Sequence, residues 1–178
     1  MRFELMRDIA TAFPRLANPE EIRHLRVWHC KYKSFAPIAQ CVNLEELVIG
    51  SYPDSSFEIL RSLSDLKYLS ILHMPKVSSL LPLASLAKLE SLSLATSPSW
   101  DGAGKRSVVE SLEPIASLPR LKHLELFGVC PVDENVEVLK RCTSLISARF
   151  SKYPTDKVER FYKDTGVVGD YAPPSSFS

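Results

Sequence analysis

The residues of this chain that could carry out chemistry are two serines, four histidines and a short glycine-rich segment. Ser91 and Ser93 are two positions apart, and His123 follows 32 residues after the first of them. A serine beside a histidine base is the nucleophile of many hydrolases, so a hydrolase-like enzyme or small-molecule binder is one hypothesis. No carboxylate is clearly placed to orient the histidine, which disfavours catalysis.

The glycine-rich segment GAGK, residues 102–105, resembles part of a phosphate-binding loop. That motif requires two glycines five positions apart, with the second directly before the lysine. It also requires a serine or threonine directly after the lysine. Ser99 stands at the first glycine position, and Arg106 stands directly after the lysine. We therefore expect no nucleotide-binding loop.

Whether the other residues can act together depends on the elements that hold them, and one pattern dominates the chain. Five segments of fifteen residues share apolar side chains at the first position and at three, six, nine, twelve and fourteen residues beyond it. They are residues 35–49, 57–71, 80–94, 112–126 and 136–150, the last with Ala148 at one of the apolar positions. Such a fixed period is the signature of a repeat protein.

Each repeat combines two local periodicities. Apolar residues three apart favour short 3₁₀ turns, and a proline in three of the copies (Pro37, Pro82 and Pro114) supports this interpretation. The last two apolar positions are two apart, which is the alternation of a strand. Because one unit cannot bury its apolar face alone, the units are expected to stack into a parallel sheet and a solenoid.

The repeats resemble the leucine-rich repeat family, whose core pattern is LxxLxLxxN. Six matching cores begin at Ile22, Leu44, Leu66, Leu89, Leu121 and Leu145, at intervals of 22, 22, 23, 32 and 24 residues. The period near 22 and the PLxxLxxL run are similar to bacterial internalins and to a protein-phosphatase regulatory subunit. The resemblance implies an α/β horseshoe of six repeats with terminal caps, a parallel sheet on the concave face and short 3₁₀ or irregular convex segments.

The chain departs from the family pattern at one position of every repeat. The family's asparagine after the strand is replaced by Cys30, Tyr52, Met74, Ser97, Val129 and Tyr153. The backbone groups that this asparagine would bond therefore need other partners.

Alternate strand residues are expected to form three columns on the concave face, where the family usually binds. The first column is His24, Glu46, Tyr68, Ser91, His123 and Ser147; the second is Arg26, Val48, Ser70, Ser93, Glu125 and Arg149; the third is Trp28, Gly50, Leu72, Ala95, Phe127 and Ser151. Aromatic residues and arginine are frequent interface anchors. We predict anchors at Trp28, Tyr68, Leu72, Phe127 and Trp100, with charge selectivity from His24, Arg26, Glu46, Glu125 and Arg149.

All four histidines lie near this face, yet the strand spacing separates them. Neighbouring strands are about 4.8 Å apart, which places His24 and His123 roughly 19 Å apart, and His29 and His73 roughly 10 Å apart. Zinc ligands must lie about 2.1 Å from one point. We therefore expect no metal site and no cofactor.

The long fourth interval contains an insertion near residues 97–107 that is expected to project beside the concave face. Long loops in compact domains are usually functional or disordered. Trp100 in this insertion is either a binding anchor or a residue folded back on the convex surface.

We expect one domain over residues 1–178, with an N-terminal cap at 1–21, six repeats at 22–153, and a C-terminal cap helix and loose tail at 154–178. In the N-terminal cap, an approximately helical spacing before Pro14 predicts a helix; its apolar residues are Phe3, Leu5, Met6, Ile9, Ala10 and Phe13. Thr155 is expected to cap a second helix over 156–164, which Gly166 ends. The proline- and serine-rich residues 169–178 are expected to be poorly ordered.

Composition and charge narrow the function further. A net charge of +1 gives no electrostatic reason to expect nucleic acid or an anionic membrane as partner. The chain shows neither a membrane-length apolar run nor a signal-peptide profile, so we expect a cytoplasmic protein, with export by a signal-independent route left open. Cys41 and Cys142 are expected to be buried, and Cys130 to lie in a loop.

The favoured hypothesis is a non-enzymatic protein–protein interaction module. It would bind a protein partner of unknown identity through the concave sheet face and the insertion, as an inhibitor, immunity or regulatory protein. We expect a monomer, while self-association through an exposed sheet edge is a further hypothesis.

Overall fold

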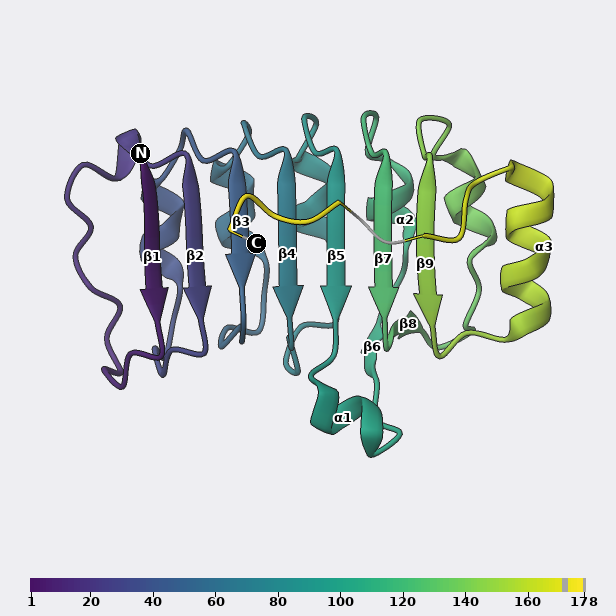
Figure 1. The fold of residues 1–178 in the computed structure, drawn as a ribbon, viewed down its shortest axis with the longest axis horizontal. Helices are drawn as coiled ribbons and strands as arrows, with labels where there is room; N and C mark the ends of the chain where they lie inside the picture. Colours follow the sequence, from purple (N-terminus) through teal and green to yellow (C-terminus); the bar gives the residue numbers. More distant parts are fainter. Residues whose placement is uncertain (171–172, 178) are drawn as a thin grey trace.

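A parallel sheet organises the protein. The computed structural model describes residues 1–170 and 173–177. In this part of the chain, seven strands form one parallel sheet in the order β1-β2-β3-β4-β5-β7-β9, and Figure 1 shows them side by side. The strands are β1 (Arg2–Met6), β2 (His24–Trp28), β3 (Glu46–Ile49), β4 (Tyr68–Leu72), β5 (Ser91–Ala95), β7 (His123–Phe127) and β9 (Ser147–Ser151). The predicted α/β solenoid with a parallel sheet is confirmed.

Short helical segments return the chain from each strand to the next, behind the sheet in Figure 1. They are the 3₁₀ helices η1 (Pro19–Glu21), η2 (Ala36–Gln40), η3 (Glu58–Ser62), η4 (Leu81–Ser85) and η5 (Glu137–Arg141), and the α-helical turn α2 (Glu113–Ala116). In η2, η4 and α2 the proline lies in the first turn, where its missing N–H costs no helical hydrogen bond. The predicted 3₁₀ turns are confirmed at Pro37 and Pro82, whereas Pro114 lies in an α-helical turn instead.

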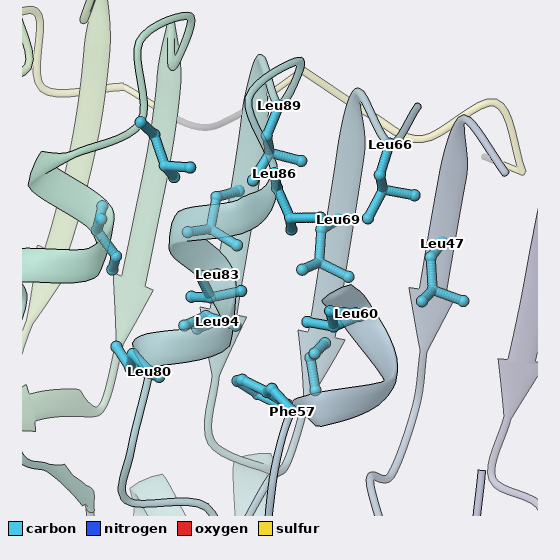
Figure 2. Packing of buried hydrophobic residues seen from close by; sticks show 14 of the residues in the cluster. Leu47, Phe57, Leu60, Leu66, Leu69, Leu80, Leu83, Leu86, Leu89 and Leu94 are labelled. Carbon is cyan, nitrogen blue, oxygen red and sulfur yellow. The ribbon is translucent and has the colours of Figure 1, made fainter. Parts of the chain in front are cut away.

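The core lies between the sheet and the short helices. Leu47 and Leu69 enter it from the strands, while Leu60 and Leu83 enter it from η3 and η4 (Figure 2). All four are fully buried, as are the first core residues of the first five repeats. Each buried leucine contributes about 1.5–3 kcal/mol, so stacking is what stabilises a repeat that could not fold alone.

Three of the four cysteines are buried, and the fourth, Cys30, is partly buried. Cys41 and Cys142 are buried, as predicted, and burial raises the pKa of each thiol to about 11. Cys130 is also buried and lies in strand β8 (Val129–Pro131), so the prediction of a loop position is wrong. In the described residues, where all four cysteines lie, none forms a disulfide.

Most strands leave the sheet through the same backbone conformation. Within the described residues, five of the seven strands are followed directly by a left-handed residue, and these are Arg7, His29, His73, Gly128 and Lys152, with φ between 51° and 68°. The turn is therefore regular although the family's asparagine is missing.

Tyrosine and cysteine side chains supply some of the hydrogen bonds that an asparagine would make. The Tyr153 hydroxyl donates to the Val129 carbonyl at 2.8 Å, which links equivalent positions of adjacent repeats. The Cys30 thiol donates to the Leu5 carbonyl at 3.4 Å. Burial raises the pKa of Tyr153 above its ordinary value, so its phenol remains a proton donor at neutral pH.

Replacing Tyr153 with phenylalanine should destabilise the fold by about 1–3 kcal/mol, because the Val129 carbonyl loses its hydroxyl donor. Urea unfolding monitored by circular dichroism measures the change. Tyr68→Phe is the matched control, because the Tyr68 hydroxyl has no hydrogen bond to the described residues. Equal destabilisation by both changes would show that the hydrogen bond contributes nothing.

The N-terminal segment forms a strand, so the predicted helix is wrong. Arg2, Glu4 and Met6 pair in register with His24, Arg26 and Trp28 of β2. Phe3 and Leu5 pack against the core from the other face of the strand. In this pairing the backbone groups of β2 form hydrogen bonds with residues 2–6. An amphipathic helix at the sheet edge would leave those groups of β2 unpaired. The tertiary pairing therefore overrides the helical spacing.

At the other end, α3 (Thr155–Thr165) and the residues after it cover the last repeat. The helix ends at Gly166 as predicted, with φ of 72°, but the N-cap is Pro154 rather than Thr155. Phe161 is fully buried. Val168 then pairs with the edge of β9: its N–H donates to the Ile146 carbonyl at 3.0 Å.

After α3 the chain turns back across the sheet. Figure 1 shows residues 173–177 running in front of the strands, from β5 towards β3. We call residues 173–177 the returning segment. It makes hydrogen bonds to β2 and β3, contrary to the expected loose tail. The other tail residues for which disorder is expected, Tyr171, Ala172 and Ser178, lie outside the described residues.

The insertion forms local structure below the sheet in Figure 1. Its first part is the helix α1 (Pro98–Gly102), and its second part is β6 (Ser107–Val109), which pairs with β8. No helix in residues 1–170 and 173–177 is both long and apolar enough to cross a membrane.

Candidate binding surface

The strand registers confirm the first two predicted columns. His24, Glu46, Tyr68, Ser91, His123 and Ser147 are successive partners across the sheet, and so are Arg26, Val48, Ser70, Ser93, Glu125 and Arg149. We call this side of the sheet, opposite the short helices, the concave face. Strand β1 extends the columns by Arg2, Glu4 and Met6, which lie in the segment for which a helix is expected from the sequence.

One cluster of charged residues lies at the β1–β3 end of the concave face. Glu46 is 5% exposed, and its carboxylate lies 2.8 Å from His24 Nδ1. Arg26 Nε lies 3.1 Å from the carboxylate of Glu4. A buried carboxylate is costly unless hydrogen-bond donors surround it, so the donors around Glu46 are essential to this cluster.

The returning segment supplies the remaining donors to Glu46. The Ser176 N–H donates to Glu46 Oε1 at 2.7 Å, and the Ser176 hydroxyl donates to Oε2. In the other direction, Arg26 Nη1 donates to the Phe177 carbonyl at 3.0 Å. The segment is therefore bonded to the sheet through side chains of two adjacent strands.

The aromatic ring of Phe177 is also held by arginines. Its centroid lies 4.1 Å from Arg2 Cζ and 5.5 Å from Arg26 Cζ, within cation–π range of both. Phe177 is 7% exposed. Burial of such a side chain contributes about 1.5–3 kcal/mol, and each cation–π contact about 0.5–2 kcal/mol.

A second cluster lies at the β5–β9 end. Ser93 Oγ donates to Glu125 Oε1 at 2.8 Å, and Arg149 Nη1 lies 3.6 Å from Glu125 Oε2. The guanidinium of Arg149 lies 4.9 Å from the ring centroid of Phe127. Arg149 therefore contacts two other predicted site residues, Glu125 and Phe127.

A groove of about 450 Å³ lies between the two clusters. The sheet side contributes Arg26, Trp28, Tyr68 and Glu125, and the returning segment forms part of the wall. Burial, together with the negative charges of Glu46 and Glu125, raises the pKa of Tyr68 to about 12. Tyr68 is therefore a neutral hydrogen-bonding group at physiological pH.

Gly50 makes room for Trp28 on the concave face. A Cβ atom at Gly50 would lie 2.9 Å from the Trp28 ring and 2.9 Å from the His29 backbone nitrogen. The indole therefore lies against Gly50 at the end of the neighbouring strand, and any larger residue at position 50 would displace it.

Trp100 does not join the columns. Its ring contacts the His73 ring edge-on at a centroid distance of 4.9 Å, and the Lys105 ammonium lies 5.7 Å from it. This contact is at the end of β4, directly after the half-buried Leu72. Trp100 and Leu72 therefore lie at the C-terminal end of β4, and neither lines the groove.

The structure does not pair the serines and histidine of the enzyme hypothesis. His123 Nδ1 lies 2.8 Å from Ser147 Oγ, while Ser93 bonds Glu125. Ser91 is 4% exposed, and its hydroxyl has no hydrogen-bond partner within residues 1–170 and 173–177. In the same residues, no three His, Cys, Asp or Glu side chains are grouped so that they could hold a metal ion.

Comparison with solved structures identifies the fold. Internalin InlF from Listeria monocytogenes superposes with a TM-score of 0.55 at 18% identity, over 86% of this chain and 50% of that chain. The chain has the leucine-rich repeat fold. This confirms, at the level of fold, the resemblance to internalins that the repeats predicted.

Two further leucine-rich repeat structures are similar. Internalin C2 from Listeria monocytogenes has a TM-score of 0.49 at 23% identity, over 73% of this chain and 62% of that chain. The leucine-rich repeat domain of the type III effector XopL has a TM-score of 0.41 at 21% identity, over 71% and 47%. This leucine-rich repeat chain thus spans between 47% and 62% of the lengths of the three. No protein-family model and no curated protein matches it.

Sequence reasoning missed Arg2, Glu4, Ser176 and Phe177 as concave residues. The alternation of polar and apolar residues in RFELM, residues 2–6, is a strand signal that could have identified the first two. Phe177 stands out only as an aromatic residue within a proline- and serine-rich stretch. Its contacts join residues about 150 positions apart, as in the Arg26 bond to its carbonyl, and no local pattern encodes them.

Proposed function

We propose that this leucine-rich repeat chain is a non-enzymatic protein-binding module that engages a protein partner through its concave face. The observation that carries the proposal is the groove, which is lined by Arg26 and Trp28 of β2, Tyr68 of β4 and Glu125 of β7. These side chains project from hydrogen-bonded strands, so little backbone entropy is lost when a partner binds. Aromatic residues and arginine, with a tyrosine held neutral, suit an interface of mixed apolar and charged character.

The remaining predicted residues extend this surface in both directions. Phe127 and Arg149 form the β7–β9 end, and His24 and Glu46 form the β2–β3 end. We propose that Trp100 and Leu72 contribute a separate contact at the C-terminal end of β4, next to the insertion. An inhibitor, an immunity protein and an enzyme regulator would all use a rigid surface of this kind.

Replacing Trp28 and Phe127 together with alanine should reduce partner binding at least tenfold, because hot-spot aromatics often contribute more than about 2 kcal/mol each. The measurement is a pull-down from lysate of the source organism, followed by titration of the purified retained protein by calorimetry. Circular dichroism verifies that the double variant remains folded.

The matched control removes two exposed apolar side chains that lie outside the concave columns, Leu81 and Val132. A partner that binds this control like the unmodified chain, but not the Trp28 and Phe127 variant, supports the concave face. A partner retained equally by all three proteins would contradict the proposed surface.

A further inference from the structure

We propose that β1, β2 and β3 form a peptide-recognition subsite for an aromatic residue preceded by a serine, and that the returning segment fills this subsite until a partner segment of the same kind displaces it. The inference rests on the protein-binding function proposed above, and it specifies the chemistry of the partner. Its starting point is that residues 173–177 already lie on the concave face as a bound peptide would (Figure 1).

The subsite binds the main chain of the segment through side chains. The Glu46 carboxylate accepts the Ser176 N–H at 2.7 Å, and the Arg26 guanidinium donates to the Phe177 carbonyl at 3.0 Å. Each non-proline residue of any protein carries an N–H and a carbonyl, so these two contacts are available to an extended segment from another protein.

The subsite selects side chains at two neighbouring positions. Arg2 and Arg26 both lie within cation–π range of the Phe177 ring, an arrangement that favours an aromatic residue and repels lysine or arginine. The Ser176 hydroxyl donates to Glu46 and lies 3.3 Å from His24 Nδ1. A hydroxyl followed by an aromatic ring is therefore the matching pair.

The two prolines before this pair determine how a ligand approaches. Pro173 and Pro174 line the groove together with Tyr68 and Glu125. Consecutive prolines restrict the unbound chain to extended conformations, so such a segment loses little entropy on binding. A partner segment that is extended and rich in proline would follow the same path across the strands.

Covalent attachment makes the returning segment a competitor. A tethered segment acts at an effective concentration near the millimolar range, so it blocks weak ligands while a partner with additional contacts displaces it. Loss of the Phe177 ring should empty the subsite and leave the rest of the concave face unchanged.

The test uses the full chain with Phe177→Ala and the synthetic peptide acetyl-PPSSF-amide. Titration is monitored by the amide chemical shifts of the labelled protein in NMR spectra. We expect the variant to bind this peptide, with shifts centred on His24, Arg26 and Glu46, and the unmodified chain to bind it at least tenfold more weakly. The peptide acetyl-PPSSA-amide should bind the variant at least tenfold more weakly than acetyl-PPSSF-amide.

A second pair of variants tests the arginine contact. In the Phe177→Ala background, Arg26→Ala should weaken binding of acetyl-PPSSF-amide at least tenfold. Arg61→Ala should have no effect, because Arg61 lies on η3 and pairs with Glu58. Hydrogen exchange gives an independent measurement: the Ser176 amide of the unmodified chain should exchange at least tenfold more slowly than the same amide in Phe177→Ala.

Several results would overturn the inference. They are equal binding of the two peptides, no binding of either to Phe177→Ala, or equal Ser176 exchange in both proteins. A dimer that dissociates on Phe177→Ala would also overturn it, because the segment would then belong to a second copy. None of these measurements uses the Trp28 and Phe127 variant that tests the proposed partner surface. A result that contradicts the subsite can therefore be distinguished from a result that contradicts the partner surface.

Discussion

Replacing Phe57 with alanine is expected to lower the free energy of unfolding by about 3–5 kcal/mol. Phe57 is fully buried at the start of η3, where Figure 2 shows it at the base of the leucine core. Its ring meets the Tyr52 ring edge-on at a centroid distance of 5.0 Å. Alanine would remove the buried ring, leave a cavity between two repeats and remove this aromatic contact.

The effect should reach beyond one repeat, because the rings of neighbouring repeats are in contact. Tyr52 also contacts Phe35 at 5.8 Å, and Phe35 contacts Phe13 at 5.8 Å. In a solenoid each repeat is stabilised by its neighbours, so the loss weakens the interface on both sides of η3.

Urea unfolding followed by circular dichroism measures the change for Phe57→Ala. Phe57→Leu is the matched control, because Leu80 and Leu112 occupy the equivalent position in two later repeats and are buried there. We expect it to cost less than about 1.5 kcal/mol. If alanine and leucine were equally tolerated, the core would have collapsed around the missing ring, and the aromatic contacts would not determine stability.

The repeat pattern alone is sufficient to predict the core, the sheet and the concave columns. Positions such as Phe57 recur at a fixed offset, so their burial follows from periodicity and needs no knowledge of distant contacts. For the same reason, aligning the repeats with one another predicts the strand registers. The registers in turn predict which residues lie beside Tyr68 and Arg26 across the sheet.

The ends of the chain could not be predicted in this way, because their structure depends on what they contact. Residues 2–6 carry both a strand alternation and a looser helical spacing, and pairing with β2 decides between them. The returning segment has the composition of a disordered tail, yet Phe177 is buried because Arg2 and Arg26 lie where it crosses the sheet. The enzyme hypothesis concerned adjacent positions, Ser91 and His123, but adjacency does not determine which hydrogen bonds form.

Gly128→Ala is expected to destabilise the chain by about 2–5 kcal/mol, through two separate effects. Gly128 has φ of 67°, a left-handed conformation that costs other residues about 1–2 kcal/mol. A Cβ atom there would also lie 2.4 Å from Oγ1 of Thr96, a residue that is 2% exposed and has little room to move. Overpacking of that kind costs about 1–3 kcal/mol.

A double-mutant cycle with Thr96→Ala separates the two effects. Removing the threonine hydroxyl and methyl should relieve the contact, so the double variant should be more stable than the sum of the single changes predicts, by about 0.5–3 kcal/mol. The backbone cost should remain. Lys152→Ala is the matched control. Lys152 directly follows β9 as Gly128 follows β7, and it has φ of 67° although it carries a side chain. Alanine there should therefore cost little.

The result also bears on the binding surface, because Gly128 directly follows Phe127. The Phe127 carbonyl accepts the Thr96 N–H at 2.8 Å, and this bond fixes the end of β7 against β5. If alanine shifts this turn, the Phe127 ring moves relative to Arg149, and partner binding should fall together with stability. If Gly128→Ala unfolds at the same urea concentration as the unmodified chain, the turn adapts freely, and the concave face is less rigid than the proposed function requires.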